Sequence, residues 1–536
     1  MIQKYSTLLA CIGLACSFLL LGMAFIPLAG AQYDEVLFIS AFISPVHIEY
    51  SAYAAGHKIP VMLMTYLGTL KAFIMQPIFE LAGYNHRTLR LPPLIFATIS
   101  VVLFLLALRR IVSQRVALFT GLLLATDAAY LLTSVYDWGP VALQHLFVGV
   151  ILYCVVRFSE DGSHRWLVLT GLAAGLALWD KAVSIWLFTG GGLALLLVFR
   201  REVLRILKQP RLAAALVLPA ILGAAPLIYY NIREPMATAL RVAREYDPPK
   251  LIKVRMMDGT LNGGSLLGYI VRDLPQGQPQ QFRLHQRASL WLSAKTDSPR
   301  RSFQQVILVC SLLALPLMLW SPYRRAALFT ALAFLFSWAL MLLTRGAGGS
   351  LHHTILLWPL PHLLAGLTLA EVARRLPERG FKIGAVVFVF AIASNLAVLN
   401  QYYAQFAAYG PTSTWTNAAR PLTEALGQMQ GRLAFPVDWG MSQQIDFYAG
   451  GQLGVIRGAE GAPLRMDDPD TRRFVEAWLA RPELVYVTYT ENNESFKGVR
   501  GKLLEAAAQL GYRDNLLRVI YDSHRVPIFE IHEFRK

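Results

Sequence analysis

The sequence predicts a polytopic α-helical membrane protein, with about eleven transmembrane helices and a small C-terminal extracytoplasmic α/β domain. Hydrophobic residues make up 55% of its 536 residues and charged residues only 16%, whereas a soluble domain has about 25% charged residues. Apolar runs of roughly 20 residues recur over most of the chain, and each can cross ~30 Å of hydrocarbon as a helix. Lys and Arg cluster in every second connection between the runs, which is typical of cytoplasmic loops.

The apolar runs give the expected spans in chain order. They lie at 8–28, 91–108, 116–135, 140–156, 166–179, 182–199, 212–230, 303–320, 326–343, 354–372 and 382–400. Basic clusters follow alternate spans, for example Arg109–Arg110, the segment 200–211 and Arg374–Arg375. This alternation predicts a cytoplasmic N-terminus and, because the number of spans is odd, a C-terminus outside the cytoplasm.

The first apolar run has two interpretations. Lys4, an apolar stretch to Phe25 and a small-residue segment at 29–31 are also typical of a cleaved signal peptide. The stretch is longer than the usual apolar region of roughly 7–15 residues in such a peptide. Because many further spans follow, we expect a retained first helix.

Residues 61–80 are apolar enough to suggest another span, but they include Lys71, Gln76 and Pro77. A crossing here would place Arg109–Arg110 outside and break the alternation of basic loops. We therefore expect an interfacial helix that lies on the outer leaflet.

Three segments are expected outside the membrane. Two are the outer loops 29–90 and 231–302, which belong to a transmembrane domain at 1–400. The third is a tail at 401–536, with strand-like runs at 484–488 and 518–522 and helix-like runs at 472–479 and 502–510. Alternating strand and helix patterns predict a separate α/β domain for the tail.

The net charge of +16 is spread over short clusters between apolar runs, so it indicates basic cytoplasmic loops and no nucleic-acid partner. The cysteines predict neither a disulfide framework nor a cysteine metal site, because all of them lie in apolar runs without a CxxC pair. They are Cys11, Cys16, Cys154 and Cys310. We interpret the acidic segment 467–470 as a surface turn of the tail.

Three carboxylates at predicted outer boundaries of the membrane are candidate catalytic residues. Asp34 and Glu35 follow the first span, and Asp137 lies in a very short second outer loop before Gly139 and Pro140. A carboxylate in a buried cleft can act as a general base, while its neighbour tunes it or binds substrate. The alternatives are a solvated surface pair for Asp34 and Glu35, and an ordinary turn residue for Asp137.

Five cationic or imidazole side chains are candidate ligands for a phosphate group. They are Lys58, Lys181, Arg345, His352 and His353. Lys181 lies at the tip of the hairpin 166–199, whose first arm is short, so the tip is expected in a cavity below the outer surface. The alternatives are a snorkelling Lys58, a solvated hairpin tip, and a flexible Gly-rich turn at 345–353.

The predicted topology places all these residues on one side of the membrane. Five polar clusters at helix ends can therefore converge on one cleft that is open to the outer leaflet. Cations in such a cleft would bind a leaving phosphate, and a carboxylate would deprotonate an acceptor. The arrangement indicates group transfer from a phosphate-linked lipid.

The chain resembles the GT-C superfamily of polyprenyl-phosphate-sugar-dependent glycosyltransferases, and especially its bacterial protein O-mannosyltransferase-like and aminoarabinose-transferase-like branches. Six features in chain order carry the resemblance. They are Asp34–Glu35, Lys58 before Pro60, Arg90 before Pro92, Asp137, Lys181, and His352–His353 before Pro359. The chain departs from the second branch at Ile59, where that branch has a Lys-Pro-Pro run, and at His353, where many relatives have tyrosine.

The resemblance implies an inverting membrane glycosyltransferase, in which Asp34 is the base or lies beside it and Asp137 is the second acidic residue. It implies that Lys58 contacts the phosphate of a polyprenyl-phosphate sugar donor, and that the acceptor is a glycan, a lipid or a protein. The implied location is a bacterial inner membrane with a periplasmic or extracellular C-terminal domain. The resemblance implies no particular cofactor, although a divalent metal beside Asp34 is compatible with the family.

Two other functions fit some of the same observations. A lipid-linked substrate transporter or flippase also needs a charged outer cavity, but transporters often have repeated halves or polar residues near the midplane. A polysaccharide sensor would use the tail for binding and the membrane part as an anchor. Eleven spans exceed what an anchor needs, so we favour the transferase.

Overall fold

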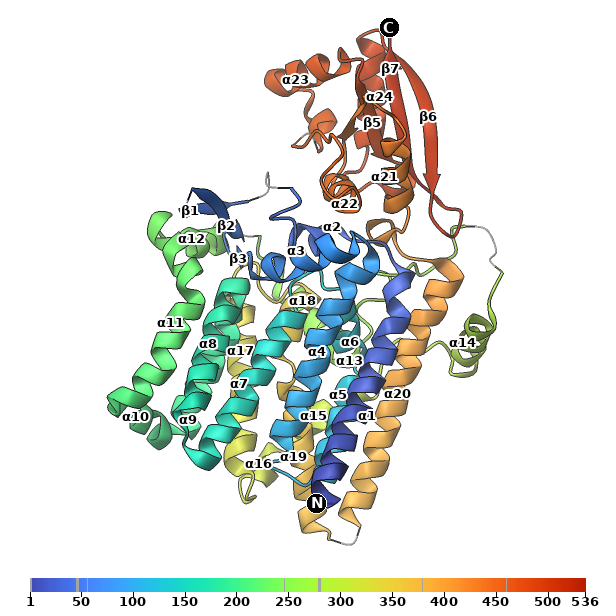
Figure 1. The fold of residues 1–536 in the computed structure, drawn as a ribbon. Helices are drawn as coiled ribbons and strands as arrows, with labels where there is room; N and C mark the ends of the chain where they lie inside the picture. The colour runs from blue at the N-terminus through green and yellow to red at the C-terminus, as the bar shows by residue number, and fades with distance from the viewer. Residues whose placement is uncertain are drawn as a thin grey trace.

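The computed structural model describes residues 2–44, 48–54, 56–244, 246–277, 281–377, 379–458 and 460–536, with the backbone alone for 2–4, 54 and 242–244. The side chain of Lys4, which contributes to the predicted orientation, therefore lies outside the described part. A bundle of long helices forms the larger part of the molecule, and a sheet-containing domain covers one end of it (Figure 1). The N-terminus lies at the opposite end of the bundle.

The bundle follows the predicted apolar runs. Its helices are α1 (Ile2–Phe25), α4 (His86–Leu108), α5 (Gln114–Ala125), α6 (Ala128–Val135), α7 (Ala142–Asp161), α8 (His164–Asp180), α9 (Ile185–Val198), α10 (Arg200–Lys208), α11 (Pro210–Arg233), α15 (Gln304–Leu313), α16 (Leu315–Met318), α17 (Arg324–Leu343), α18 (Leu351–Thr354), α19 (Leu360–Arg375) and α20 (Gly380–Tyr409). Many of their apolar side chains remain exposed, such as Leu20, Leu222 and Val386. Such faces suit contact with lipid, so the protein is a multi-span membrane protein by fold.

Fewer described helices are long and apolar enough to cross a membrane than the eleven that the sequence predicts. Among the described residues, seven helices are long and apolar enough to span, and two bent pairs, α5 with α6 and α9 with α10, raise the number to nine. Helix α8 has 17 residues and α15 only 10, so both are short for a full crossing. Each predicted run is helical, but the count of eleven stays a prediction.

The bend between α5 and α6 has a polar cause. Asp127 caps α6, since its Oδ1 accepts a hydrogen bond of 3.1 Å from the Tyr130 N–H. Its Oδ2 accepts from Gln304 Nε2 at 2.6 Å and Trp358 Nε1 at 2.7 Å. These three donors satisfy a fully buried carboxylate, and the two helices meet at 58° there.

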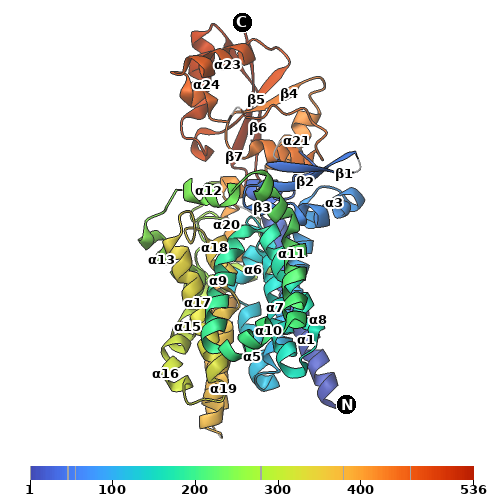
Figure 2. The ribbon, with the colours of Figure 1, turned by 90° about the vertical axis from the view of Figure 1, so that its left-hand side faces the viewer.

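Residues 61–80 do not form a span, but they also do not form one interfacial helix. The chain makes a three-stranded sheet of β1 (Tyr50–Ala54), β2 (His57–Met64) and β3 (Leu67–Gly68) before α3 (Leu70–Ala82) begins. The β-branched residues Ile59 and Val61 suit a strand, and β1 pairs with Ile59 and Pro60. Helix α3 then lies across the end of the bundle that carries the C-terminal domain (Figure 1, Figure 2).

The long outer loop 231–302 contains three helices. They are α12 (Ala237–Arg244), α13 (Lys250–Asn262) and α14 (Leu284–Lys295). The strongly basic α10 and the short α16 lie towards the far end, away from the C-terminal domain (Figure 1). Helix α10 carries Arg200, Arg201, Arg205 and Lys208, and its end of the bundle is the predicted cytoplasmic side.

The tail folds as a small α/β domain, as the sequence predicts. Its sheet has the order β4-β5-β7-β6, with β4 (Leu433–Pro436) parallel to β5 (Leu484–Tyr489) and with β7 (Pro527–Arg535) antiparallel to both β5 and β6 (Arg513–Tyr521). Its helices are α21 (Ala419–Gly427), α22 (Met441–Tyr448), α23 (Pro469–Leu479) and α24 (Val499–Gln509). The expected boundary at residue 400 falls inside α20, which continues to Tyr409.

Direct contacts fix this domain to the bundle. The Gly30 N–H donates to the Trp415 carbonyl at 2.8 Å, and Gln444 Nε2 donates to the Ala31 carbonyl at 2.7 Å. A buried ion pair of 2.8 Å joins Arg272 and Asp522. The segment that leaves α1 is therefore bound between the two parts of the molecule.

This topology predicts opposite exposure of the two ends. In a variant whose four cysteines are alanine, Ser523→Cys should react with a membrane-impermeant maleimide in intact cells. Lys208→Cys should react only after the membrane is opened, because α10 lies at the far end of the bundle. Labelling of both positions in intact cells would contradict the orientation.

Candidate functional site

A buried ion pair organises the segment that carries the first acidic motif. Arg90 in α4 is fully buried and binds Glu35 through two bonds, from Nε at 2.8 Å and from Nη2 at 2.9 Å. The same guanidinium donates to the carbonyls of Ile26, Ala29 and Gly30 at 2.6–2.9 Å. Arginine suits this position because its planar fork supplies five donors.

Asp34 is held next to this ion pair but is not part of it. The Gln32 side chain caps α2 (Tyr33–Leu37), because its Oε1 accepts from the Asp34 N–H at 2.7 Å and the Glu35 N–H at 3.2 Å. Glu35 Oε2 in turn accepts from the Gln32 N–H at 3.2 Å. This capping box fixes α2 and leaves the half-buried carboxylate of Asp34 at the edge of the site.

The surroundings of Asp34 alter its proton affinity. Burial raises the pKa of Asp34 to about 6, and the Gln32 hydrogen bond and the positive charge of Lys181 partly offset this rise. Burial disfavours the charged carboxylate, while a nearby cation favours it. Asp34 is therefore charged near neutral pH but binds a proton readily, as a general base requires.

Asp137 belongs to a second buried ion pair. Lys71 from α3 lies 2.9 Å from Asp137 Oδ2, and both side chains are at most 3% exposed. Asp137 Oδ1 accepts from the N–H groups of Val141 and Ala142 at 2.6 and 3.1 Å. Asp137 thus caps the start of the following helix and binds α3 to the bundle.

Lys181 lies beside this pair, at the tip of the hairpin formed by α8 and α9. Its Nζ donates to the Gly139 carbonyl and, at 3.4 Å, to the His352 carbonyl. Asp180 next to it accepts from Gln144 Nε2 at 2.8 Å. The buried amino group thus has carbonyl partners from two other segments. Burial lowers the pKa of Lys181 to about 7, and the negative charges of Asp137, Asp180 and Asp34 partly offset this decrease.

The two predicted histidines are in contact with these groups. His352 Nδ1 lies 2.8 Å from Ser350 Oγ, and a Cβ on Gly139 would come within 2.5 Å of His352 Cβ. The second outer loop therefore passes closely over His352, which explains the glycine. His353 packs against His352, with ring centroids 4.4 Å apart.

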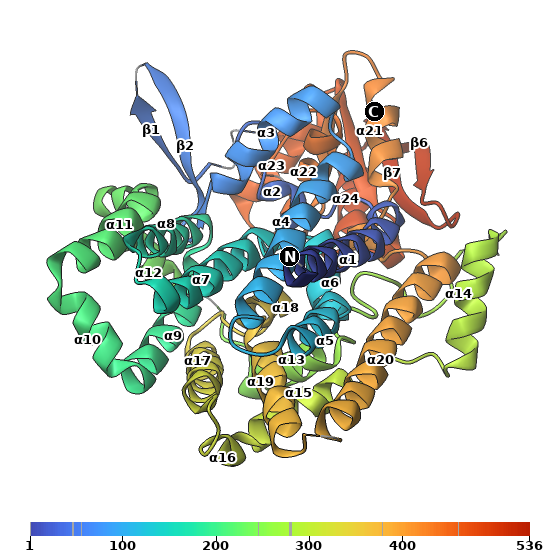
Figure 3. The ribbon, with the colours of Figure 1, turned by 60° about the horizontal axis from the view of Figure 1, so that its bottom comes forward.

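Two predicted phosphate ligands lie elsewhere. Lys58 is exposed in β2, opposite Tyr53 near the end of a hairpin that projects from the bundle (Figure 3). Arg345 is exposed in the turn after α17. The structure therefore brings together Asp34, Asp137, Lys181 and the histidine pair, but not Lys58.

Sequence reasoning missed the role of Lys71 and treated Arg90 only as part of a motif. A lysine within an apolar segment is costly in a membrane environment, and that cost was the available signal for a buried partner. The partners themselves depend on tertiary contacts, since Arg90 and Glu35 are 55 residues apart.

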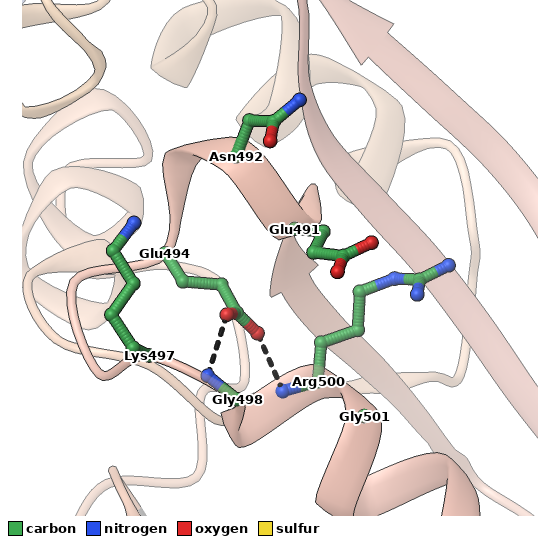
Figure 4. Close-up of a pocket in the computed structure, with 7 residues that line it drawn as sticks. All are labelled: Glu491, Asn492, Glu494, Lys497, Gly498, Arg500 and Gly501. Atoms are coloured by element: carbon green, nitrogen blue, oxygen red, sulfur yellow. Dashed lines mark hydrogen bonds between the residues drawn. The ribbon is translucent and has the colours of Figure 1, made fainter.

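The described residues contain no group of three or more His, Cys, Asp or Glu side chains that could hold a metal ion. A separate hollow of about 500 Å³ lies on the C-terminal domain, between Glu491 and the start of α24 (Figure 4). Glu494 there accepts from the N–H groups of Gly498 and Arg500 at 2.7 and 2.8 Å. That carboxylate already occupies the N-terminus of α24, so its hydrogen bonds stabilise the loop.

Known structures share this arrangement of bundle and domain. ArnT from Cupriavidus metallidurans bound to undecaprenyl phosphate matches with a TM-score of 0.57 and 14% identity, over 97% of each chain. Its apo form matches with a TM-score of 0.56 and 14% identity, over 94% of this chain and 93% of that one. This chain has a GT-C fold.

Two further comparisons agree with this fold. The family described as dolichyl-phosphate-mannose-protein mannosyltransferase matches residues 68–230. The mycobacterial arabinofuranosyltransferase AftD matches with a TM-score of 0.52 and 13% identity, over 98% of this chain and 40% of that one. No protein of curated function matches by sequence. The likeness to GT-C proteins expected from the sequence is confirmed at the level of the fold.

The Arg90–Glu35 pair predicts a large loss of stability when one partner is removed. Glu35→Gln or Arg90→Gln should lower the free energy of unfolding by about 3–5 kcal/mol, because one buried charge is left without its partner. Thermal unfolding of the purified protein in detergent measures the effect. Arg420→Gln is the matched control, since its partner Glu424 is exposed, and it should change stability by less than about 1 kcal/mol.

Lys71→Met should likewise destabilise the protein, because Asp137 then remains buried and unpaired. The double variant Lys71→Met with Asp137→Asn removes both charges and should recover part of the loss. An equal or larger loss in the double variant would contradict the direct coupling between Lys71 and Asp137.

Proposed function

We propose that the protein is a membrane glycosyltransferase that moves a sugar from a polyprenyl-monophosphate donor to an acceptor at the outer face of the membrane. The observation that carries the proposal is the half-buried carboxylate of Asp34, which interacts electrostatically with the buried side chain of Lys181. Such a pair supplies both functions of the reaction: a base for the acceptor and a cation for the leaving phosphate. The fold and the lipid phosphate bound to ArnT support this donor class.

Asp34 is the proposed general base. It accepts the proton of an acceptor hydroxyl while the hydroxyl oxygen attacks the anomeric carbon of the sugar. The bond from that carbon to the phosphate oxygen breaks at the same time, and the polyprenyl phosphate leaves with the electron pair. Attack on the face opposite the leaving group inverts the anomeric carbon.

Lys181 is the proposed ligand of the donor phosphate, and the histidine pair lines the same part of the site. Its present partners are backbone carbonyls of Gly139 and His352, which a charged phosphate oxygen can outcompete because charge-assisted hydrogen bonds are stronger. Asp137 and Lys71 then hold the second outer loop in place. Arg345 stays a proposed phosphate ligand only for a state in which its turn moves inward.

Glu35 has a different proposed role from the catalytic one suggested by the sequence. Its carboxylate is 1% exposed and fully engaged with Arg90 and the Gln32 N–H. A carboxylate with these partners cannot also accept a proton from substrate without breaking the ion pair. We therefore assign it to positioning α2 and Asp34.

The alternative of a lipid-linked transporter differs in a measurable way. A transporter moves its substrate without breaking a glycosidic bond, so it needs no base with an adjusted pKa. No observation on the described residues favours transport over transfer, and the fold relatives support transfer.

Asp34→Asn should lower the transfer rate by roughly 10²–10⁴-fold, the range for loss of a general base. Transfer of labelled sugar from polyprenyl-phosphate donors by protein in nanodiscs measures this. Asp467→Asn is a matched control, because Asp467 is in a surface turn of the tail. Equal rates for the wild type and Asp34→Asn would remove Asp34 from the base role.

The rate should also depend on pH in a defined direction. Because the pKa of Asp34 is about 6, the wild-type rate should fall as the pH decreases through that value and the base becomes protonated. The residual rate of Asp34→Asn should lack this decrease. A wild-type transfer rate that does not change between about pH 5 and about pH 8, a range that includes this pKa, would contradict the assignment of Asp34 as the base.

Lys181→Gln should raise the KM for the donor by about 10- to 100-fold, because a hydrogen bond to a charged group contributes about 1.5–3 kcal/mol. Lys58→Gln is the matched control, since that side chain is exposed on the β1–β2 hairpin, and it should leave this KM nearly unchanged. A larger rise in the donor KM for Lys58→Gln than for Lys181→Gln would instead assign the phosphate contact to Lys58.

A further inference from the structure

An aromatic pair joins the C-terminal domain to the acidic motif. The ring of Tyr33, the residue before Asp34, lies against the ring of Trp439 with centroids 4.3 Å apart and a tilt of 38°. Trp439 comes from the tail, where it follows Val437 and Asp438 after β4. Both side chains are partly exposed, and Tyr33 directly precedes Asp34 in α2.

Trp439 is held rigidly by the residue before it. The buried carboxylate of Asp438 accepts from the Trp439 N–H at 2.6 Å and from the N–H groups of Ser495 and Phe496 at 2.9 Å each. Ser495 and Phe496 follow Glu494 in the loop that leads into α24. Figure 4 shows this loop. Three backbone donors on one carboxylate fix the turn that presents the indole.

The turn also requires a glycine after the tryptophan. Gly440 has a φ of +88°, a conformation that other residues rarely adopt. A Cβ at this position would lie 3.3 Å from the Tyr33 Cβ. The absence of a side chain therefore lets the turn approach α2 closely enough for the two rings to stack.

A second carboxylate lies near the aromatic pair. Glu460 interacts electrostatically with Tyr33, and its Oε1 accepts from Ser442 Oγ at 2.8 Å. Burial, Asp34 and Glu460 together raise the pKa of Tyr33 to about 12, so its hydroxyl stays a hydrogen-bond donor. The aromatic pair thus lies near two carboxylate acceptors and includes a hydroxyl group.

We propose that Tyr33 and Trp439 form the acceptor subsite, and that the acceptor group is a sugar ring. The electron-rich face of an aromatic ring suits the C–H face of a pyranose, and carboxylates accept from its hydroxyl groups. The carboxylates of Asp34 and Glu460 near this pair disfavour an anionic acceptor group. The inference rests on the proposed transferase function and adds the substrate class of its acceptor.

The first test is binding without turnover, so that it remains informative if transfer fails. Saturation-transfer NMR on full-length protein in nanodiscs would use an N-acetylglucosamine disaccharide and, separately, a Ser/Thr-rich peptide. The disaccharide should give signals from its ring protons with the wild type and lose most of them with Trp439→Ala. Trp439→Phe should retain them, because it keeps an aromatic face.

Trp478→Ala is the matched control, because Trp478 packs on Phe435 within the same domain and does not contact α2. It should leave the disaccharide signals unchanged. Binding of the peptide in place of the disaccharide, or equal disaccharide binding by Trp439→Ala and the wild type, would overturn the subsite.

A kinetic test separates this subsite from the transferase itself. Trp439→Ala should raise the KM for a glycolipid acceptor by roughly three- to tenfold, the effect of one aromatic contact, with the KM for the donor unchanged. An equal rise in both values would indicate a structural role and overturn the subsite. Loss of transfer in the wild type with intact disaccharide binding would instead contradict the transferase alone.

Discussion

The bond network of Arg90 is the constraint on which the rest of the site depends. A single guanidinium binds Glu35 and three carbonyls of the segment that leaves α1. The charge is fully buried, so the pair persists only while every donor keeps its acceptor. The same segment also binds the C-terminal domain through Gly30 and Ala31. Membrane helices, acidic motif and tail domain therefore share one fixed junction.

The charged side chains near this junction differ in whether they form ion pairs. Lys71 with Asp137 and Arg90 with Glu35 are closed ion pairs, whereas Asp34 and Lys181 have no carboxylate–cation bond of their own within the described residues. Closed pairs stabilise the geometry but are poor acids and bases, because a proton or a phosphate must first break them. Asp34 and Lys181 lie outside these pairs, and they are the groups that we propose act on the substrate.

The sequence predicted the helical membrane fold and the tail domain, since both follow from apolar runs and from alternating patterns that are local in the chain. It also proposed Asp34, Asp137, Lys181 and the histidine pair as site residues, and the structure places these residues at one end of the bundle. It did not predict the pairing of Glu35 or of Lys71, or the strand that carries Lys58 to a projecting hairpin. These depend on contacts between distant segments, and so does Trp439, whose neighbour Tyr33 is some four hundred residues earlier.

The most direct test of the account is an experimental structure of the protein with bound undecaprenyl phosphate, the lipid seen in ArnT. The account predicts the phosphate against the Lys181 ammonium, the Asp34 carboxylate facing the anomeric position that a sugar would occupy, and an unchanged Arg90–Glu35 pair. A phosphate bound at the basic end near α10, or one bound with Glu35 released from Arg90, would contradict it.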